Sequence, residues 1–283
     1  MTIQNIFVVG AGTMGNGIAQ LAATSGHQVT CMDVVPAALE KARQTIAKST
    51  VKLVEKGILT ADQKARADSI SYISDLAAVA EADLVIEAAT ENPELKLKVF
   101  RDLDAAAPRA TILASNTSSI SITRIAVATR RPDRVIGMHF MNPVPVMRLV
   151  EVIRGLGTSD ATLQAIMDTC RALGKEPVEV NDAPGFISNR ILCPMINEAV
   201  FALQERVASA EAIDTVMKLG MNHPMGPLAL ADLIGLDVVL FIMQVLQRDL
   251  GEDKYRPAPL LQRMVDAGYL GRKSGRGFFQ YPS

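Results

Sequence analysis

Three glycines near the start of the chain stand at the spacing of a nucleotide-binding turn. Gly10, Gly12 and Gly15 follow the apolar run 6–9 and open a helical stretch, and Asp33 ends the next apolar run 18 residues after Gly15. Such glycines allow a tight turn, close approach of the backbone to a pyrophosphate, and close packing of helix on strand. The helix start adds N–H groups and a partial positive charge for the phosphates. The sequence therefore predicts a dinucleotide site; the alternative is a glycine-rich turn with a structural aspartate.

Asp33 also indicates which dinucleotide the site takes. A carboxylate at the end of the second strand accepts hydrogen bonds from the adenosine ribose hydroxyls and repels a 2′-phosphate. No arginine follows Asp33 directly, so the pattern favours NAD over NADP.

His139 and Glu151 form the second candidate pair. Each lies six residues from Pro145, so a hairpin that turns around this proline places them opposite each other. An imidazole held by a carboxylate is a general base with a fixed tautomer and orientation. Taken alone, His139 also fits a structural role at a strand end, but beside a cofactor site we favour the catalytic interpretation.

A third feature is a row of lysines on one predicted helix. Lys48, Lys52 and Lys56 follow one another at i, i+4 spacing, so they share a helix face. The pattern fits either a solvated face or a docking strip for an anionic ligand, and spacing does not decide between them.

The elements that must position these residues alternate between strand and helix. This alternation predicts an α/β domain with a Rossmann-type doubly wound sheet. A helical hairpin at about 37–67 is inserted between strands, and Thr60 to Gln63 reads as the capping box of its second helix. Strands are expected at 6–9, 28–32, 69–73, 84–88, 111–114, 134–139, 147–153 and 176–180, and further helices at 18–25, 93–103, 120–126 and 161–173.

The remainder of the chain shows only helical periodicity. A boundary is expected at 181–185, where Pro184 and Gly185 stand, so we predict an NAD-binding domain over 1–183 and an all-helical domain over 184–283. Its helices are expected at 186–205, 210–219, 231–250 and 260–267.

Composition excludes several classes of function. The 283 residues are 49% hydrophobic and 21% charged with a net charge of −1, so neither a nucleic-acid nor a membrane partner is expected. No apolar run reaches the length of a bilayer-spanning helix, and the start of the chain lacks a presequence pattern. The three cysteines follow no metal or disulfide spacing, so we expect no metal site and a cytoplasmic location.

Taken together, the motifs resemble those of the L-3-hydroxyacyl-CoA dehydrogenase family, and the likeness is greatest to its bacterial 3-hydroxybutyryl-CoA dehydrogenases. The likeness runs in order along essentially the whole chain. Met141 and Phe279 depart from it, since other members often carry Phe and Tyr there. The matching segments are VGAGTMG (9–15), SNTSS (115–119), GMHFMNPVP (137–145), LVEV (149–152), DAPGFISNR (182–190), GP (226–227) and GRKSGRGFF (271–279).

The resemblance implies a role for each matching catalytic residue. His139 is the catalytic base, Glu151 is its partner, and Asn142 helps to order the surroundings of His139. Ser118 and Asn189 contact the oxygen-bearing carbons of the substrate or its thioester side.

The resemblance also implies the residues that bind cofactor and coenzyme. Lys52 and Lys56 meet the CoA phosphates, which favours the docking-strip interpretation, and the helical domain forms a homodimer. The implied cofactor-binding residues are Gly10, Gly12, Thr13, Met14, Gly15, Asp33, Glu91, Lys96, Asn116 and Ser118.

The implied function is NAD-dependent oxidation of a (3S)-3-hydroxyacyl-CoA, with acetoacetyl-CoA as the substrate of the reverse reaction. Two alternatives are a dehydrogenase of a free 3-hydroxy acid and a non-catalytic dinucleotide-binding protein. The first has no need of Lys52 and Lys56, and the second has no need of His139, Glu151 and Ser118 together.

Overall fold

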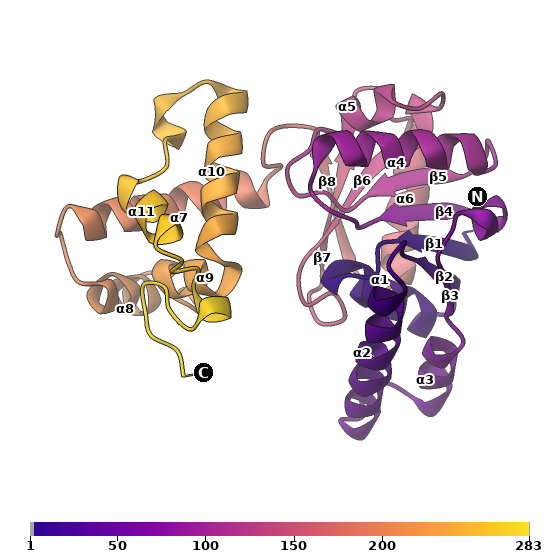
Figure 1. Ribbon diagram of the computed structural model, residues 1–283, viewed down its shortest axis with the longest axis horizontal. Helices are drawn as coiled ribbons and strands as arrows, with labels where there is room; N and C mark the ends of the chain where they lie inside the picture. The colour runs from indigo at the N-terminus through magenta and orange to yellow at the C-terminus, as the bar shows by residue number, and fades with distance from the viewer. Residues whose placement is uncertain (1–2, 283) are drawn as a thin grey trace. The chain divides into compact units, whose positions relative to one another are not determined.

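The structure is a computed structural model that describes residues 3–282. The chain divides into two compact units, one ending at Ala183 and the other beginning at Pro184 (Figure 1). The first unit contains the sheet, and the second is helical.

The first unit is built on one eight-stranded sheet of order β3-β2-β1-β4-β5-β6-β7-β8. The strands from β3 to β6 are parallel, β7 is antiparallel to β6, and β8 is parallel to β7. This order confirms the predicted Rossmann-type fold. The strands are β1 (Asn5–Val9), β2 (Gln28–Met32), β3 (Ser71–Ile73), β4 (Leu84–Glu87), β5 (Ile112–Ser115), β6 (Val135–Phe140), β7 (Leu149–Arg154) and β8 (Glu176–Asn181).

Helices follow the strands in the alternation that the sequence predicts. The first helix begins at Thr13 rather than at residue 18, so it starts directly at the glycine turn. The helices are α1 (Thr13–Thr24), α2 (Pro36–Glu55), α3 (Ala61–Asp68), α4 (Pro93–Ala106), α5 (Ile122–Val127) and α6 (Asp160–Ala172), with short 3₁₀ turns η1 (Ala77–Glu81) and η2 (Pro132–Arg134).

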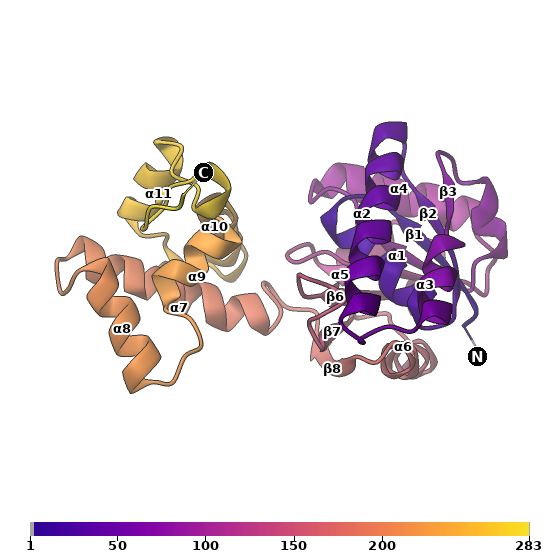
Figure 2. The ribbon, with the colours of Figure 1, turned by 90° about the horizontal axis from the view of Figure 1, so that it is seen from below.

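The inserted hairpin consists of α2 and α3, which pack on each other and on α1 (Figures 1 and 2). Thr60 accepts from the Gln63 N–H while the Gln63 side chain accepts from the Thr60 N–H, which confirms the predicted capping box. The Gln63 amide also donates to the carbonyl of Thr24 at the end of α1. The hairpin is thus fastened to the helix that carries the glycine turn.

Alternate side chains of each strand face two helical layers. Ile6, Val8 and Ile112 belong to the core that α1, α2 and α6 cover. Phe7 and Leu113, their neighbours in sequence, are buried as well and point to the opposite face. Burial on both faces explains why these strands read as unbroken apolar runs.

The second unit consists of helices packed around an apolar core that includes Ile196, Leu228 and Leu236. Gly185 and Phe186 have positive φ angles of 76° and 49°, so α7 starts two residues later than expected. The elements are α7 (Ser188–Gln204), α8 (Ala210–Gly220), α9 (Pro227–Ile234), α10 (Leu236–Leu250), α11 (Pro259–Asp266) and the 3₁₀ turns η3 (Asp253–Tyr255) and η4 (Arg272–Ser274).

The prediction of one helix over 231–250 is wrong. The segment breaks at Gly235, whose φ of 106° is outside the helical range, and the two helices meet at 98°. Asp232, just before the break, is fully buried and accepts hydrogen bonds from the N–H groups of Phe278 and Phe279 and from the Tyr281 hydroxyl. These contacts bring the 278–281 segment against the end of α9.

Within residues 3–282 no individual helix has the length and apolarity to cross a bilayer, although α9 and α10 taken together, bent as they are, pass that test by length and composition alone.

Candidate functional site at the carboxyl edge of the sheet

The carboxyl ends of the parallel strands form one edge of the sheet, which we call the carboxyl edge. The chain leaves β1 toward β2 and β3 on one side and returns to β4 on the other. Ligands of open α/β sheets bind where the strand order reverses in this way, beyond the carboxyl ends. The position between β1 and β4 is therefore the expected cofactor crevice.

The glycine turn lies at this crevice and has the space that a dinucleotide needs. Gly10 has a φ of 99°, and a Cβ on it would lie 2.8 Å from the carbonyl oxygen of Ala88, next to β4. A Cβ on Gly15 would lie 1.8 Å from the Gly10 carbonyl oxygen, so α1 packs on the turn only with glycine there. A Cβ on Gly12 would meet nothing within 4 Å. That open space at the N-terminus of α1 fits a pyrophosphate.

Asp33, directly after β2, links the turn to the next loop. Its carboxylate accepts from the Ala11 N–H at 2.8 Å and from the Val35 N–H at 2.9 Å. The side chain thus fixes the glycine turn and stays partly exposed for a ribose. Thr13 and Met14 form the first turn of α1 beside it, Thr13 exposed and Met14 half-buried.

His139 and Glu151 lie directly opposite each other on β6 and β7, which confirms the predicted hairpin register. His139 Nδ1 is 2.7 Å from a Glu151 carboxylate oxygen, and the two residues are 8% and 2% exposed. A carboxylate on Nδ1 fixes the tautomer that carries its hydrogen there and makes Nε2 the basic nitrogen. This arrangement is chemically suited to proton transfer at Nε2.

Neighbouring loops are tied to the end of β6. The Asn116 side chain, which follows β5, accepts from the N–H of Phe140 at 2.9 Å. Asn142 is exposed in the next loop. This loop is held by Lys175, whose buried ammonium donates to the carbonyls of Val144 and Met147 at 2.6 and 2.7 Å. Burial lowers the pKa of Lys175.

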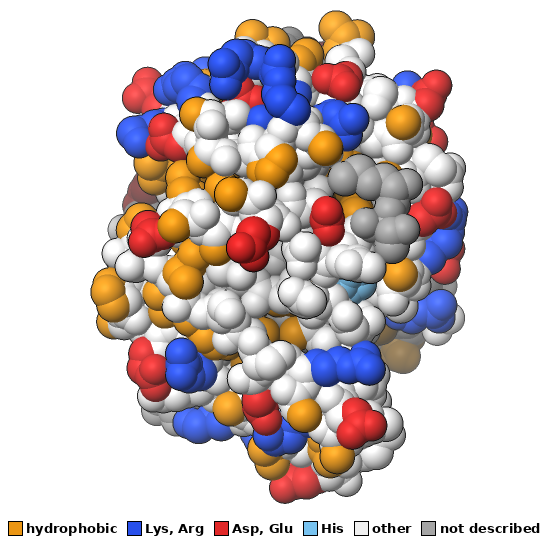
Figure 3. Space-filling model, turned by 90° about the vertical axis from the view of Figure 1, so that its right-hand side faces the viewer, with side chains coloured by type: hydrophobic (Ala, Val, Ile, Leu, Met, Phe, Trp, Pro, Cys, Tyr) orange, Lys and Arg blue, Asp and Glu red, His pale blue; other side chains and the backbone are white. Residues whose placement is uncertain are grey.

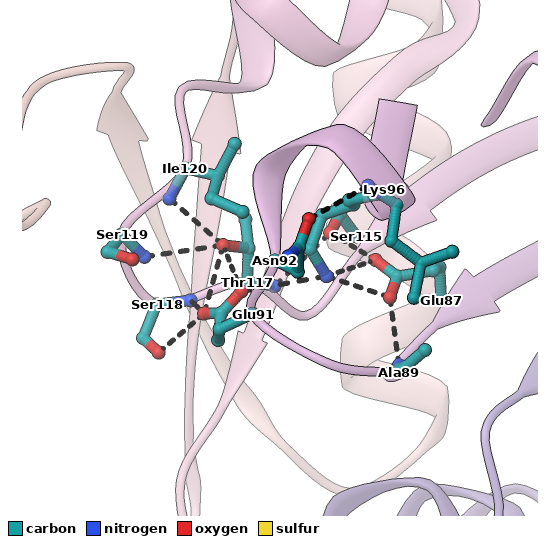
Figure 4. A network of polar contacts seen from close by, with 11 residues as sticks. Glu87, Ala89, Glu91, Asn92, Lys96, Ser115, Thr117, Ser118, Ser119 and Ile120 are labelled. Atoms are coloured by element: carbon teal, nitrogen blue, oxygen red, sulfur yellow. Dashed lines mark hydrogen bonds and ion pairs between the residues drawn. The ribbon is translucent and has the colours of Figure 1, made fainter. Parts of the chain in front are cut away.

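A network of charged and polar side chains lies at the ends of β4 and β5 (Figure 4). Glu87, the last residue of β4, is fully buried and receives the Lys96 ammonium on both oxygens at 2.7 Å. The Ser115 hydroxyl donates to Glu87 at 2.7 Å. Lys96 is 2% exposed, so this predicted cofactor-binding residue lies under the edge, paired with a carboxylate.

Glu91 holds the loop that carries Ser118. Its carboxylate accepts from the Ser118 N–H at 2.6 Å, from the Ser118 hydroxyl at 2.9 Å, and from the Thr117 hydroxyl. The Thr117 oxygen accepts in turn from the N–H groups of Ser119 and Ile120. The predicted residues Glu91 and Ser118 are therefore in direct contact. The N-cap of α5 is Ser121, whose side chain accepts from the N–H of Arg124.

Sequence reasoning missed Glu87, Ser115, Thr117 and Lys175. A signal for Glu87 was present, because a carboxylate that ends the apolar strand LVIE has no place in a core unless it is paired. Ser115 and Thr117 belong to the matching segment 115–119 but were given no role there, and Lys175 lies in no matching segment.

The remaining predicted residues belong to other elements. Lys52 and Lys56 are exposed at the end of α2. Asn189 is the second residue of α7, in the second unit, and is half-buried.

A pocket at the other edge of the sheet takes no part in this arrangement. It has a volume of about 570 Å³ and is lined by polar residues that include His27, Arg66 and Glu81. Figure 3 shows the right-hand side of the view in Figure 1, where Lys and Arg side chains gather at the top and acidic and apolar side chains are scattered below. None of the predicted site residues lines this pocket.

Comparison with known families decides what the carboxyl edge belongs to. Residues 5–183 match the NAD binding domain of 3-hydroxyacyl-CoA dehydrogenase, and residues 185–281 match its C-terminal domain. The chain belongs to the 3-hydroxyacyl-CoA dehydrogenase family. It is therefore an oxidoreductase that uses NAD, and the interpretation as a non-catalytic dinucleotide-binding protein is excluded.

Members of this family are similar over the full length. The chain is 57% identical to a probable 3-hydroxybutyryl-CoA dehydrogenase of Bacillus subtilis, over 99% of this chain and 98% of that protein. It is 42% identical to the human mitochondrial hydroxyacyl-coenzyme A dehydrogenase, over 99% and 91%. The crystal structure of (S)-3-hydroxybutyryl-CoA dehydrogenase from Ralstonia eutropha superimposes with a TM-score of 0.97 at 53% identity, covering both chains completely. The resemblance inferred from the motifs is confirmed.

Proposed function

We propose that the chain oxidises (3S)-3-hydroxybutyryl-CoA to acetoacetyl-CoA with NAD and reduces acetoacetyl-CoA in the reverse direction. The observation that carries the proposal is the 2.7 Å contact between His139 Nδ1 and Glu151 at the carboxyl edge, on the strand next to β5. The relatives that share more than half of its residues bear the name 3-hydroxybutyryl-CoA dehydrogenase.

His139 exchanges the proton of the substrate hydroxyl. In oxidation Nε2 accepts this proton while the carbon–hydrogen bond breaks, and Glu151 stabilises the imidazolium that forms. In reduction the imidazolium returns the proton to the ketone oxygen. General acid–base assistance of this kind contributes about 10²–10⁴-fold in rate.

The glycine turn and Asp33 would hold the adenosine and pyrophosphate half of NAD. The Asp33 carboxylate, already anchored on two backbone N–H groups, accepts from the ribose hydroxyls. Glu91 and Asn116, in the loops after β4 and β5, and Lys96, buried against Glu87, are proposed to serve the nicotinamide half. When bound, NAD accepts the hydride that leaves the carbinol carbon.

Ser118 and Asn189 are proposed to orient the reacting end of the substrate, and Asn142 to order the loop after His139. Ser118 has its backbone N–H and hydroxyl fixed on Glu91, so its position is set before substrate arrives. Because the Ser118 hydroxyl gives its hydrogen to Glu91, its fixed oxygen would contact the substrate as an acceptor.

Lys52 and Lys56 are proposed to meet the CoA phosphates. Both are exposed on the last turn of α2 or just beyond it. The cytoplasmic location, the assignment of the second unit to substrate binding and dimerisation, and the homodimer itself remain predictions.

The test of the proposed function is a comparison of acetoacetyl-CoA with free acetoacetate, followed by NADH absorbance. Turnover of the thioester without turnover of the free acid is expected. Equal turnover of both would select the dehydrogenase of a free 3-hydroxy acid instead. A series of 3-ketoacyl-CoA substrates of increasing chain length then checks the preference for the four-carbon acyl group.

A further inference from the structure

Glu87 is a charged residue of the carboxyl edge to which neither the sequence motifs nor the proposed chemistry gives a role. It is 0% exposed, and its two oxygens accept from the Ala89 N–H, from Ser115, and twice from Lys96. A buried carboxylate is stable only with such partners. The question is what this arrangement does for the residues above it.

The Lys96 ammonium lies near two carboxylates, one closer than the other (Figure 4). It is 2.7 Å from Glu87, at hydrogen-bonding distance to both oxygens, and 3.6 Å from Glu91. The side chains of Lys96 and Glu87 are each 1% exposed, whereas that of Glu91 is 34% exposed. Lys96 therefore pairs with Glu87 rather than with Glu91.

Because Lys96 pairs with Glu87, the Glu91 carboxylate is available to accept hydrogen bonds from the loop after β5. One of its oxygens accepts both the N–H and the hydroxyl of Ser118, at 2.6 and 2.9 Å. The Lys96 ammonium competes strongly for the same carboxylate, because its full positive charge adds Coulomb attraction that the uncharged Ser118 donors lack. Without Glu87, Lys96 would move to Glu91 and draw it away from Ser118.

A second route joins Glu87 to the same loop. Ser115 donates its hydroxyl hydrogen to Glu87 at 2.7 Å and accepts from the Thr117 N–H at 3.2 Å. Thr117 in turn donates to Glu91. Both routes from Glu87 therefore end at the segment that presents Ser118.

We propose that Glu87 is a positioning residue of the dehydrogenase reaction, which holds Lys96 and so keeps Glu91 available to orient Ser118. The proposal rests on the proposed role of Ser118 at the substrate. It assigns Glu87 no contact with substrate or cofactor.

The test is a cycle of Glu87→Gln, Lys96→Met and the double variant, with kcat for acetoacetyl-CoA reduction measured at saturating NADH. Glu87→Gln is expected to lower kcat by about ten- to a hundredfold, as misplacement of a substrate-orienting group does. The double variant is expected to regain most of that loss, because the competing ammonium is gone. NADH affinity, measured by fluorescence, accounts separately for any contact that Lys96 makes with the cofactor.

Three further variants distinguish a loss of stability, a loss of the contact through Ser115, and a loss of the role of Ser118 itself. Asp104→Asn breaks a buried ion pair at the other end of α4 and should lower thermal stability without lowering kcat. Ser115→Ala interrupts the second route and is expected to lower kcat less than Glu87→Gln; it replaces that variant if Glu87→Gln does not fold. Ser118→Ala reports on the proposed function: a normal kcat there would refute the role of Ser118 itself.

The proposal is overturned if Ser118→Ala loses activity while Glu87→Gln keeps its kcat. It is equally overturned if the double variant is as slow as Glu87→Gln, or if Ser115→Ala, used in its place, leaves kcat unchanged.

Discussion

Each of the two edges of the sheet contains a buried ion pair with one member on α4. The two pairs differ in the groups that they contact. At the carboxyl edge, Glu87 and Lys96 connect through Ser115 and Glu91 to a loop of polar side chains. At the amino edge, where the parallel strands begin, Asp104 pairs with Arg131.

The Arg131 guanidinium donates to backbone carbonyls at the end of α4 and just after it. Its acceptors include the carbonyls of Asp104, Ala107 and Pro108, and its side chain is 3% exposed. A buried guanidinium that donates to main-chain carbonyls stabilises the fold and is not available to contact a substrate. Buried charge thus serves turnover at one edge and stability at the other, and substitutions at the two edges should separate these effects.

The largest effect is expected for His139→Ala at the carboxyl edge. Loss of the acid–base group should lower kcat by about 10²–10⁴-fold, with NADH affinity near that of the unaltered protein. His27→Ala at the amino edge is the matched control and should keep normal turnover, since His27 Nδ1 hydrogen-bonds the Ala22 carbonyl and its side chain lines the pocket that contains none of the predicted site residues. Near-normal turnover of His139→Ala in steady-state assays would refute the catalytic assignment.

Arg131→Met at the amino edge should act on stability instead. Removing the buried guanidinium leaves Asp104 paired with the exposed Arg130 and costs about 3–5 kcal/mol of unfolding free energy. Arg130→Met is the control: Arg130 pairs with the same carboxylate but is 72% exposed, so about 1 kcal/mol or less should be lost. Urea unfolding measures both, and a drop in kcat of folded Arg131→Met would contradict the division between the edges.

Asp33→Ala returns to the carboxyl edge and should weaken NADH binding. The variant loses two anchors of the glycine turn as well as the ribose acceptor, and hydrogen bonds to a charged group contribute about 1.5–3 kcal/mol, or roughly ten- to a hundredfold in affinity. Fluorescence titration measures the affinity. Asp33→Asn keeps the acceptor without its charge and should gain affinity for NADPH relative to NADH; no gain would argue against charge as the discriminating factor.

Lowering the pH should remove the contribution that the Asp104–Arg131 pair makes to stability. Burial alone would raise the pKa of Asp104, but hydrogen bonds from Arg131 and Arg130 outweigh it and hold this pKa below its ordinary value. A carboxyl with a lowered folded-state pKa stabilises the protein above the unfolded pKa of about 3.9 and loses this contribution as pH falls through the folded value. The difference in unfolding free energy between the unaltered protein and Asp104→Asn should therefore shrink toward low pH. A difference that stays constant would contradict this linkage.

The smallest effect is expected for Lys52→Ala. An exposed charge contributes up to about 1 kcal/mol, so KM for acetoacetyl-CoA should rise by about two- to fivefold at low salt and hardly at all at high salt. Lys41→Ala is the control, because Lys41 is exposed on the same helix three turns earlier. An equal rise for both variants would indicate a general effect of net charge rather than a docking strip.

Sequence predicted well wherever one local rule decides the structure. The glycine turn needs particular backbone conformations, and the pairing of His139 with Glu151 follows from their equal distance to Pro145. The capping box at Thr60 is likewise set by residues three positions apart. Each of these features depends on neighbours in the chain.

The features that sequence missed depend on partners far apart in the chain. Ser115 reaches Glu87 across 28 residues, and Lys175 reaches Val144 across 31. The break at Gly235 is similar, because a single glycine is tolerated in a helix and the bend accompanies contacts between Asp232 and residues more than forty positions later. Such contacts appear only once the fold has brought the segments together.

Asp232 has a consequence for the order in which the protein is made. Its carboxylate is fully buried, and its donors are supplied by residues 278–281, which leave the ribosome after every helix of the second unit. The sheet unit precedes it in the chain and can fold while synthesis continues. The helical unit, by contrast, must wait for residues 278–281 before the donors of this carboxylate are in place, so its fold is completed only after α9 and α10 have been made.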